Sequence, residues 1–291
     1  EAPAAAAATM AWRRDVIRIL EELYPLEYAE GWDNVGVLID TMSEGGPVSD
    51  VAFVTNDLTE AVVDEAIAAG ASLIITYHPT PFHSFKKLTR NNAASRVILK
   101  CASAGIIVFS PHTACDIAFG GVNDWLAQGF AFGQEASKIT PVEPRTDDPR
   151  AGSGRVVRLD KAVTVRQVIE KTKEKLGVQH VRVSLASNLL GVQGALDKEG
   201  VVQSVAVQAG AGSSVLAKCT SAQVWVTGEM SHHEVLAAAA NNVTVILAEH
   251  TNTERGFLPN MVEEVAKRIQ QKGSKVSFLV SRMDSDPLTV V

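Results

Sequence analysis

The chain has 291 residues, of which 46% are hydrophobic and 21% are charged, and its formal net charge is −6. This balance excludes a wholly disordered chain, and the length allows either one large domain or two modest lobes. The negative charge argues against a broad nucleic-acid interface, and the longest apolar runs, such as 243–248, are too short to cross a membrane.

The N-terminal part of the chain alternates apolar runs with helical patterns. A first helical pattern follows Thr9 and ends before Pro25, since a proline does not continue a helix. Strands are then expected at 35–39, 51–55, 72–76 and 106–110, and helices around 61–69 and 93–104. Short β-rich runs separated by helices predict a mostly parallel sheet that is covered on both faces.

The segment 141–154 breaks this rhythm with three prolines and two glycines, so we expect a linker there. It would separate an N-terminal α/β lobe, 1–140, from a C-terminal α/β lobe, 155–291. The second lobe is expected to contain strands near 156, 181, 205–208, 224–227, 243–248 and 276–280, with helices at 165–176, from Glu234 and from Glu254.

Both halves of the chain carry the pattern His-Thr-x-x-acid directly after a predicted strand. It occurs from His112 to Asp116 and again from His250 to Glu254. We interpret this repetition as the trace of a diverged duplication. The expected architecture is therefore two α/β lobes with mostly parallel sheets, which face one another across a cleft; the family resemblance described below implies that the lobes are interlinked.

Histidines and carboxylates with the character of metal ligands follow the predicted strands. His78, Asp116, His250 and Glu254 lie just past strand ends, where open α/β sheets bind ligands. His250 and Glu254 are four residues apart and share one face if the helix has begun. Imidazole nitrogen combined with carboxylate oxygen suits zinc, manganese, iron or nickel, so we expect a divalent-metal site in the cleft.

Each of these acids also has a purely structural explanation. Thr251 and Glu254 fit a capping box, in which the glutamate only closes a first helical turn. Ser231 and Glu234 fit the same template. Asp116 could bond local backbone amides at the end of a loop.

A glycine-rich turn, Gly210-Ala211-Gly212-Ser213, follows the strand at 205–208 and opens a helix. Its backbone amides could cradle a phosphate, which makes Gly210, Gly212 and Ser213 candidate substrate-binding residues. The alternative is a tight strand-to-helix turn without a ligand. The turn is not a P-loop, because no lysine follows in the required arrangement.

Three cysteines, Cys101, Cys115 and Cys219, are too few and too scattered for a disulfide framework, which favours a reducing, intracellular compartment. The alanine-rich residues 1–9 could be the remnant of a processed targeting peptide or of an added segment. We expect a cytoplasmic or nuclear protein, and the mitochondrion stays open as an address.

Six ordered stretches of the chain resemble the NIF3 family, the NGG1-interacting factor 3-like proteins, and are more similar to its eukaryotic NIF3-like 1 branch than to bacterial members. They run in family order and, with the C-terminal Asp286-Pro287-Leu288, cover nearly the whole chain. The stretches are Ala29 to Gly36, Thr55 to Thr59, Tyr77 to Pro79, His112 to Asp116 with Gly121 to Asp124, Thr227 to His233, and His250 to Gly256.

The resemblance implies a dinuclear metal centre and ring-shaped hexamers that are trimers of dimers. The family's metal ligands fall on His78, Asp116, His250 and Glu254. Tyr77 stands where bacterial members carry the first histidine of a His-His-Pro triplet, and a neutral phenol is a poorer ligand than an imidazole. One or two divalent ions per subunit are therefore expected.

The first expected function is a metal-dependent hydrolase, with a phosphate-bearing compound or a nucleotide as the candidate substrate class. His112 and Glu229 are its candidate proton-transfer groups, and Asp33 and Asn34 are further candidate substrate contacts.

The alternative is a regulatory protein. The resemblance implies a transcription-regulator partner and a cytoplasmic and nuclear location, with a structural or vestigial metal. Neither function requires direct contact with nucleic acid or a membrane.

Overall fold

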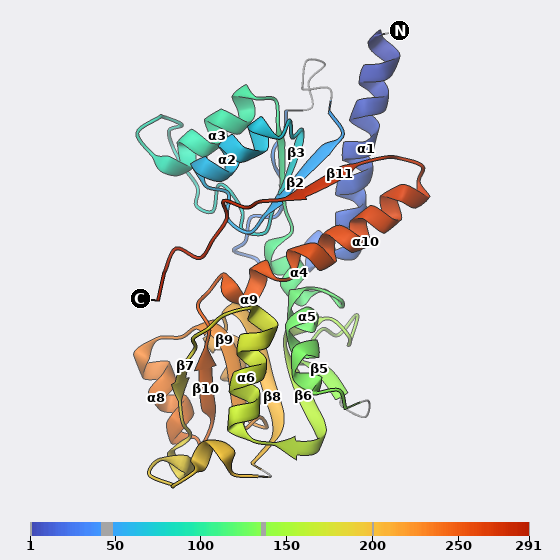
Figure 1. Ribbon diagram of the computed structural model, residues 1–291. Helices are drawn as coiled ribbons and strands as arrows, with labels where there is room; N and C mark the ends of the chain where they lie inside the picture. Colours follow the sequence, from blue (N-terminus) through green and yellow to red (C-terminus); the bar gives the residue numbers. More distant parts are fainter. Residues whose placement is uncertain (1, 42–48, 135–137, 200, 291) are drawn as a thin grey trace. The chain divides into compact units, whose positions relative to one another are not determined.

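The computed structural model describes residues 2–41, 49–134, 138–199 and 201–290. The chain divides into two compact units, and each unit is assembled from two separate stretches of sequence. Unit 1 contains Glu1–Cys115 and Leu258–Ser285, and unit 2 contains Asp116–Phe257 and Asp286–Val291. Figure 1 labels most of the helices and strands of both units.

Unit 1 contains a five-stranded sheet in the order β1-β4-β3-β2-β11. The strands β4, β3, β2 and β11 are parallel neighbours, and β1 pairs with β4 in the antiparallel sense. The strands are β1 (Gly36–Ile39), β2 (Val51–Thr55), β3 (Leu73–Thr76), β4 (Ile107–Ser110) and β11 (Ser277–Val280). All residues of β3 and β4 are buried, which explains why both strands are continuous apolar runs.

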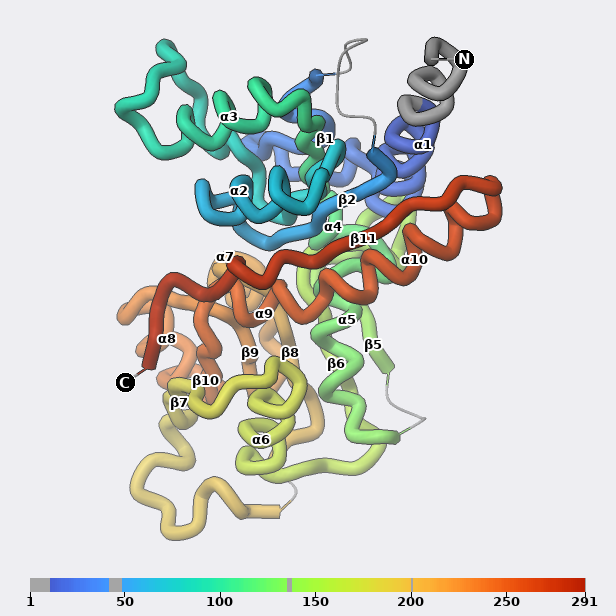
Figure 2. The backbone as a smooth tube through the Cα atoms, turned by 45° about the horizontal axis from the view of Figure 1, so that its top comes forward, coloured from blue at the N-terminus to red at the C-terminus, as the bar shows by residue number. Residues whose placement is uncertain are grey.

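Five helices accompany this sheet among the described residues of unit 1. They are α1 (Ala2–Leu23), α2 (Glu60–Ala68), α3 (Ala93–Ser103), α10 (Leu258–Gln271) and α4 (His112–Ile117), whose last residues belong to unit 2. The core that α2 and α3 share with the sheet includes Phe53, Val63, Ile74 and Val97. The helices α1 and α10 contact each other, and α10 also contacts β2 and β11, as the trace in Figure 2 makes visible.

Unit 2 contains a six-stranded mixed sheet in the order β5-β6-β8-β9-β10-β7. The strands β8, β9 and β10 are parallel, whereas β5, β6 and β7 join the sheet through antiparallel pairs. The strands are β5 (Lys138–Pro144), β6 (Gly152–Val163), β7 (Arg182–Ser184), β8 (Val202–Ala211), β9 (Val224–Glu229) and β10 (Thr244–Leu247).

Five helices accompany this sheet among the described residues of unit 2. They are α5 (Val122–Gln128), α6 (Val165–Leu176), α7 (Ser213–Leu216), α8 (His232–Ala240) and α9 (Asn252–Arg255). One core cluster joins α7 and α8 to the sheet and includes Ala206, Leu216, Trp225, Ala238 and Val245. Short 3-10 turns lie at Leu26–Tyr28 in unit 1 and at Gly129–Ala131, Ser187–Leu189 and Ala195–Asp197 in unit 2.

A buried ion pair ties α5 to β6 in unit 2. The guanidinium of Arg155 donates to both carboxylate oxygens of Asp124 at 2.7 Å, and its side chain is 1% exposed. The remaining N–H groups of Arg155 donate to the carbonyls of Gly152, Gly154 and Ala118. A buried charge is tolerated only when its hydrogen-bonding groups are satisfied, and Arg155 meets that condition.

The predicted α/β class with two sheets and mostly parallel strands is confirmed, although antiparallel pairs join β5, β6 and β7 to the sheet of unit 2. The predicted strands and helices are found within a few residues of their expected positions. The domain boundaries differ from the prediction. The chain passes from unit 1 to unit 2 after Cys115 and returns at Leu258. None of the helices in the described ranges combines the length and the apolar character that a membrane span requires.

The expected linker at 141–154 is instead the core of a β-hairpin, in which Pro144 of β5 pairs with Gly152 of β6. The prolines are tolerated because β5 is an edge strand, where a missing N–H removes no partner from the sheet. Gly152 is required because a Cβ atom there would collide with the carbonyl of Glu143. Proline and glycine therefore mark two closely paired strands of a hairpin here, not a flexible connection.

Candidate metal centre

Polar side chains of unit 1 follow the ends of three neighbouring parallel strands. Asp57 comes two residues after β2, His78 two residues after β3 and His112 two residues after β4. Because the carboxyl ends of parallel strands meet at one edge of a sheet, these side chains lie close together. The ring centroids of His78 and His112 are 5.3 Å apart.

A carboxylate of the neighbouring strand end holds His78. Its Nδ1 lies 2.9 Å from Oδ1 of Asp57, and the His78 side chain is 18% exposed. An imidazole whose Nδ1–H donates to a carboxylate directs Nε2 away from that carboxylate, in the arrangement typical of metal-binding histidines. Asp57 lies in the stretch Thr55 to Thr59, whose pattern alone indicates no role for it, and its contact with His78 at the sheet edge indicates that it positions that histidine.

His112 is held in the same way by Asp33, which lies in the loop before β1. The Nδ1 atom of His112 is 2.7 Å from Oδ1 of Asp33, and the backbone amide of Thr113 donates to Oδ2 at 3.1 Å. The Asp33 side chain is 1% exposed. Burial alone would raise the pKa of Asp33, but the hydrogen bonds from His112 and Thr113 outweigh burial and lower it, so the carboxylate stays ionised.

Asn34, which the sequence assigns to substrate binding, links two loops of unit 1. Its side-chain amide donates to the carbonyl of Pro81 at 2.8 Å. The link joins the loop before β1 to the loop after β3. Contact of Asn34 with a substrate stays a prediction.

The corresponding edge of unit 2 brings together residues at the ends of β8 and β9 and residues that follow β10. The Nδ1 atom of His250 lies 2.9 Å from Oε1 of Glu229, and its Nε2 lies 3.2 Å from Oε1 of Glu254. Glu254 is almost fully buried, with 3% of its side chain exposed, whereas Glu229 is half exposed. His250 therefore has the carboxylate of Glu229 at its Nδ1 and the carboxylate of Glu254 at its Nε2, the nitrogen that would bind a metal.

Glu254 does not close a capping box with Thr251. The Thr251 side chain makes no cap hydrogen bond to α9 and instead donates to Oδ2 of Asp286 at 2.8 Å. The capping box at the other candidate position is present, because the backbone amide of Ser231 donates to Glu234 at 2.8 Å. Of the two candidate capping boxes, only the one formed by Ser231 and Glu234 is present.

The chain leaves no room for a side chain beside His250 and Glu254. Gly210 lies there with a φ of +65°, and a Cβ atom on it would be 2.6 Å from Oε1 of Glu254 and 2.9 Å from Nε2 of His250. Contacts under 3.0 Å are essentially never found for real Cβ atoms. Nε2 of His250 and Oε1 of Glu254 thus lie together against the backbone of Gly210. An imidazole nitrogen combined with a buried carboxylate oxygen fits a divalent ion.

The same turn does not support the predicted phosphate cradle. The amide of Gly210 donates to Oγ1 of Thr253 at 2.8 Å, and the amide of Gly212 donates to Oγ1 of Thr227 at 3.0 Å. An amide used inside the protein is not available to a phosphate. The turn is the tight strand-to-helix connection given as the alternative, and substrate contact by Ser213 stays a prediction.

Two other residues of the predicted metal site have defined positions. Asp116 is partly buried near the end of α4, and its main-chain carbonyl accepts from the side chain of Asn123 at 3.0 Å. Its role as a ligand stays a prediction. Tyr77 is buried, with its ring 5.3 Å from that of His78 and 5.8 Å from that of His112.

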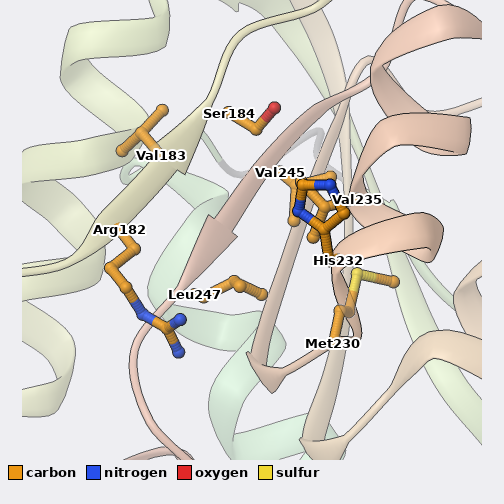
Figure 3. A pocket seen from close by; sticks show the side chains of 8 residues that line it. All are labelled: Arg182, Val183, Ser184, Met230, His232, Val235, Val245 and Leu247. Atoms are coloured by element: carbon orange, nitrogen blue, oxygen red, sulfur yellow. The ribbon is translucent and has the colours of Figure 1, made fainter.

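A separate pocket of about 290 Å³ lies beside β7 in unit 2. Figure 3 shows Arg182 and Val183 on β7, Val245 and Leu247 on β10, and His232 on α8 around it. The lining contains one histidine and no carboxylate, so it does not supply a second set of hard metal ligands. His232, the first residue of α8, therefore lines a pocket of mixed polar and apolar character.

Comparisons with known proteins show which family the chain is similar to over most of its length. A profile of the Duf34/NIF3 (NGG1p interacting factor 3) family matches residues 11–287. The chain is 39% identical over 278 residues to "Protein NIF3 homolog" of Schizosaccharomyces pombe, covering 94% of this chain and 96% of the relative. It is 38% identical over 296 residues to "NGG1-interacting factor 3" of Saccharomyces cerevisiae, covering 98% and 99%.

The fold also has solved counterparts. The crystal structure of a Bacillus cereus protein related to NIF3 superposes with a TM-score of 0.76 and 22% identity, covering 96% of this chain and 98% of that one. At this identity the likeness concerns the fold alone. The family profile and the two fungal relatives decide the assignment: the chain belongs to the Duf34/NIF3 (NGG1p interacting factor 3) family.

Proposed function

We propose that the protein is a divalent-metal-dependent hydrolase whose metal ligands are His78, Asp116, His250 and Glu254. The observation that carries this proposal is the position of His250 between two carboxylates, with Glu254 at its Nε2 and Glu229 at its Nδ1. Within unit 2, His250 and Glu254 could each give one ligand atom to a metal ion. Such a donor set suits zinc, manganese, iron or nickel, with one or two ions per subunit.

The partners behind the histidines support the same proposal. Asp57 accepts from Nδ1 of His78 and Glu229 accepts from Nδ1 of His250, both at 2.9 Å. A carboxylate in this position fixes the tautomer and raises the basicity of the other nitrogen, which strengthens a metal–imidazole bond. We therefore assign Glu229 to positioning His250, in place of the proton transfer that the sequence suggested.

A divalent ion held by these ligands supplies a nucleophile from water near neutral pH. His112 is the group of the chain suited to accept a proton in that reaction, because Asp33 holds its Nδ1 and leaves Nε2 for an external partner. Asp33 is in turn a positioning residue and not a substrate contact, since both of its oxygens already accept hydrogen bonds.

The alternative is a regulatory protein that binds a partner through its surface. One observation favours it: the Saccharomyces cerevisiae relative, 38% identical over nearly its whole length, bears the name NGG1-interacting factor 3. A transcription-regulator protein is then the candidate partner, and the metal would be structural. Self-association into dimers and hexamers stays a prediction under either function, as does a cytoplasmic or nuclear location.

The test begins with the metal content of protein purified without a histidine tag, measured by mass spectrometry. We expect near-stoichiometric metal, lost in the double variant His250→Ala/Glu254→Ala and kept in His233→Ala, an exposed histidine of the same unit. A panel of phosphate esters and nucleotides is then assayed for hydrolysis by wild type and Glu254→Ala. Protein that stays metal-free after reconstitution contradicts the proposed site, and full metal without turnover favours the alternative.

A further inference from the structure

Two large aromatic side chains of unit 1 remain exposed next to His112. Trp32 is 64% exposed and Phe82 is 49% exposed. Trp32 lies in the loop before β1, and Phe82 lies in the loop after β3. Single exposed apolar residues are ordinary on a protein surface, but two adjacent rings beside a candidate proton-transfer group form a surface that a ligand could cover.

The two rings and His112 form one cluster. The ring centroids of Trp32 and Phe82 are 6.1 Å apart with an interplanar angle of 48°, so the two rings are not stacked on each other. Each makes an edge contact with His112, at 6.0 Å from Trp32 and at 6.1 Å from Phe82. These separations lie within the range of favourable aromatic pairs, and the imidazole lies at the base of the cluster, 8% exposed.

The backbone holds the two aromatic loops together. The side-chain amide of Asn34, two residues after Trp32, donates to the carbonyl of Pro81, the residue before Phe82, at 2.8 Å. Asp33, between Trp32 and Asn34, is held by His112 and Thr113. Hydrogen bonds next to Trp32 and Phe82 therefore fix the loops that carry the two rings. This lowers the entropy cost of binding a ligand against them.

Two lysines in the loop that carries Phe82 favour an anionic ligand. Lys86 and Lys87 follow Phe82 in the same loop and are exposed, in a chain whose formal net charge is −6. Aromatic side chains that stack on a planar ring, combined with lysines that attract phosphate, are the combination by which proteins bind nucleotide bases. A saturated sugar phosphate would use the lysines alone.

We propose that Trp32 and Phe82 bind the planar heteroaromatic ring of the substrate beside His112, and that the substrate is a nucleotide. The proposal deepens the hydrolase function above and rests on it for the role of His112. It makes the aromatic pair a specificity determinant that distinguishes ring-bearing from ring-free phosphate compounds.

The test compares binding of AMP with binding of ribose 5-phosphate, which lacks the ring, by isothermal titration calorimetry. Wild type, Trp32→Ala, Phe82→Ala and the control Phe85→Ala are used, each in metal-loaded and chelator-treated form. Phe85 is similarly exposed, at 51%, and lies three residues after Phe82 in the same loop. Metal content and oligomeric mass are recorded for every variant.

We expect wild type and Phe85→Ala to bind AMP more tightly than ribose 5-phosphate. Trp32→Ala and Phe82→Ala should each weaken AMP binding about 5- to 100-fold, the range found when a stacking ring is removed, and leave ribose 5-phosphate binding and metal content unchanged. The inference would be overturned if wild type and Trp32→Ala bound AMP with equal affinity, or if wild type did not bind AMP. It would also be overturned if the substitutions changed only the oligomeric mass. Loss of metal binding would instead contradict the hydrolase proposal, so the two failures are distinguishable.

Discussion

Substitution of Gly210 by alanine tests the candidate metal centre without removing a ligand. Gly210 has a φ of +65°, and the added methyl group would lie 2.6 Å from Oε1 of Glu254 and 2.9 Å from Nε2 of His250. Ordinary van der Waals contact begins at 3.4 Å. The glutamate oxygen must therefore retreat by roughly 0.8 Å, several times the roughly 0.2 Å by which metal–ligand distances vary.

The expected loss has two parts that can be measured separately. Alanine at a positive φ costs about 1 kcal/mol of folding free energy at any such position. Displacement of the two side chains adds a loss of metal affinity of about 10- to 100-fold, the range found when the partners that hold metal ligands are altered. Gly177 provides the matched control, because its φ is +67° and no atom lies within 4 Å of a Cβ atom there.

The assay is a competition titration of zinc against a chromophoric chelator, with urea unfolding of the same samples. We expect Gly177→Ala to lose stability only, and Gly210→Ala to lose both stability and zinc affinity. Equal zinc affinity in the two variants would refute the view that His250 and Glu254 hold a metal against the backbone of Gly210. It would also remove the main support for the hydrolase proposal.

Three further predictions concern groups outside this centre. Asp124→Ala strands the buried guanidinium of Arg155 and should lower the free energy of unfolding by about 3–5 kcal/mol in urea titrations. The control Asp148→Ala should have a much smaller effect, because its partner Arg150 is exposed. Burial, with a smaller effect of Lys171, lowers the pKa of Lys175 to about 8. The unfolded chain therefore binds more protons than the folded chain between pH 8 and 10.5, and the free energy of unfolding of wild type should rise with pH relative to that of Lys175→Met across this window. Unfolding curves measure this difference, and a difference that stays constant with pH would contradict the prediction. Burial raises the pKa of the Cys101 thiol to about 12, so an aromatic disulfide reagent at pH 8 should leave Cys101 unmodified until the protein is unfolded, and rapid labelling of the native protein would show that this burial is wrong.

Local sequence patterns predicted most of the secondary structure, because the deciding interactions are themselves local. The helix at 165–176 is found with the expected bounds, since Thr164 caps its first turn and Gly177 ends it in a left-handed conformation. The parallel strands were recognisable because complete burial makes them short apolar runs. The hairpin at 141–154 is not predicted by local patterns, because Pro141 and Pro144 are tolerated through the edge position of β5 and Gly152 is required by the close approach of Glu143.

The candidate site was predicted at the level of residue types and not at the level of roles. His250 and Glu254 could be paired in advance because they are four residues apart. The contact of Asp33 with His112 joins positions 79 residues apart, and that of Glu229 with His250 joins positions 21 apart, so both depend on which loops the sheets bring together. Sequence alone therefore assigned these acids to substrate binding and proton transfer, whereas their contacts indicate that they position histidines.

The division of each unit into two stretches of sequence constrains the order in which the chain can fold during synthesis. The sheet of unit 1 is completed by β11, which pairs with β2 in parallel, Ser277 opposite Val51. Most of unit 2, residues 116–257, is made in between and can begin to fold first. Until residue 280 has left the ribosome, β2 presents an open edge of apolar strand, the kind of surface on which nascent chains associate. Strand β11 thus covers the open edge of β2, which is made more than 220 residues earlier. A nascent chain that stalls near residue 257 leaves this edge at 51–55 open to association with other chains.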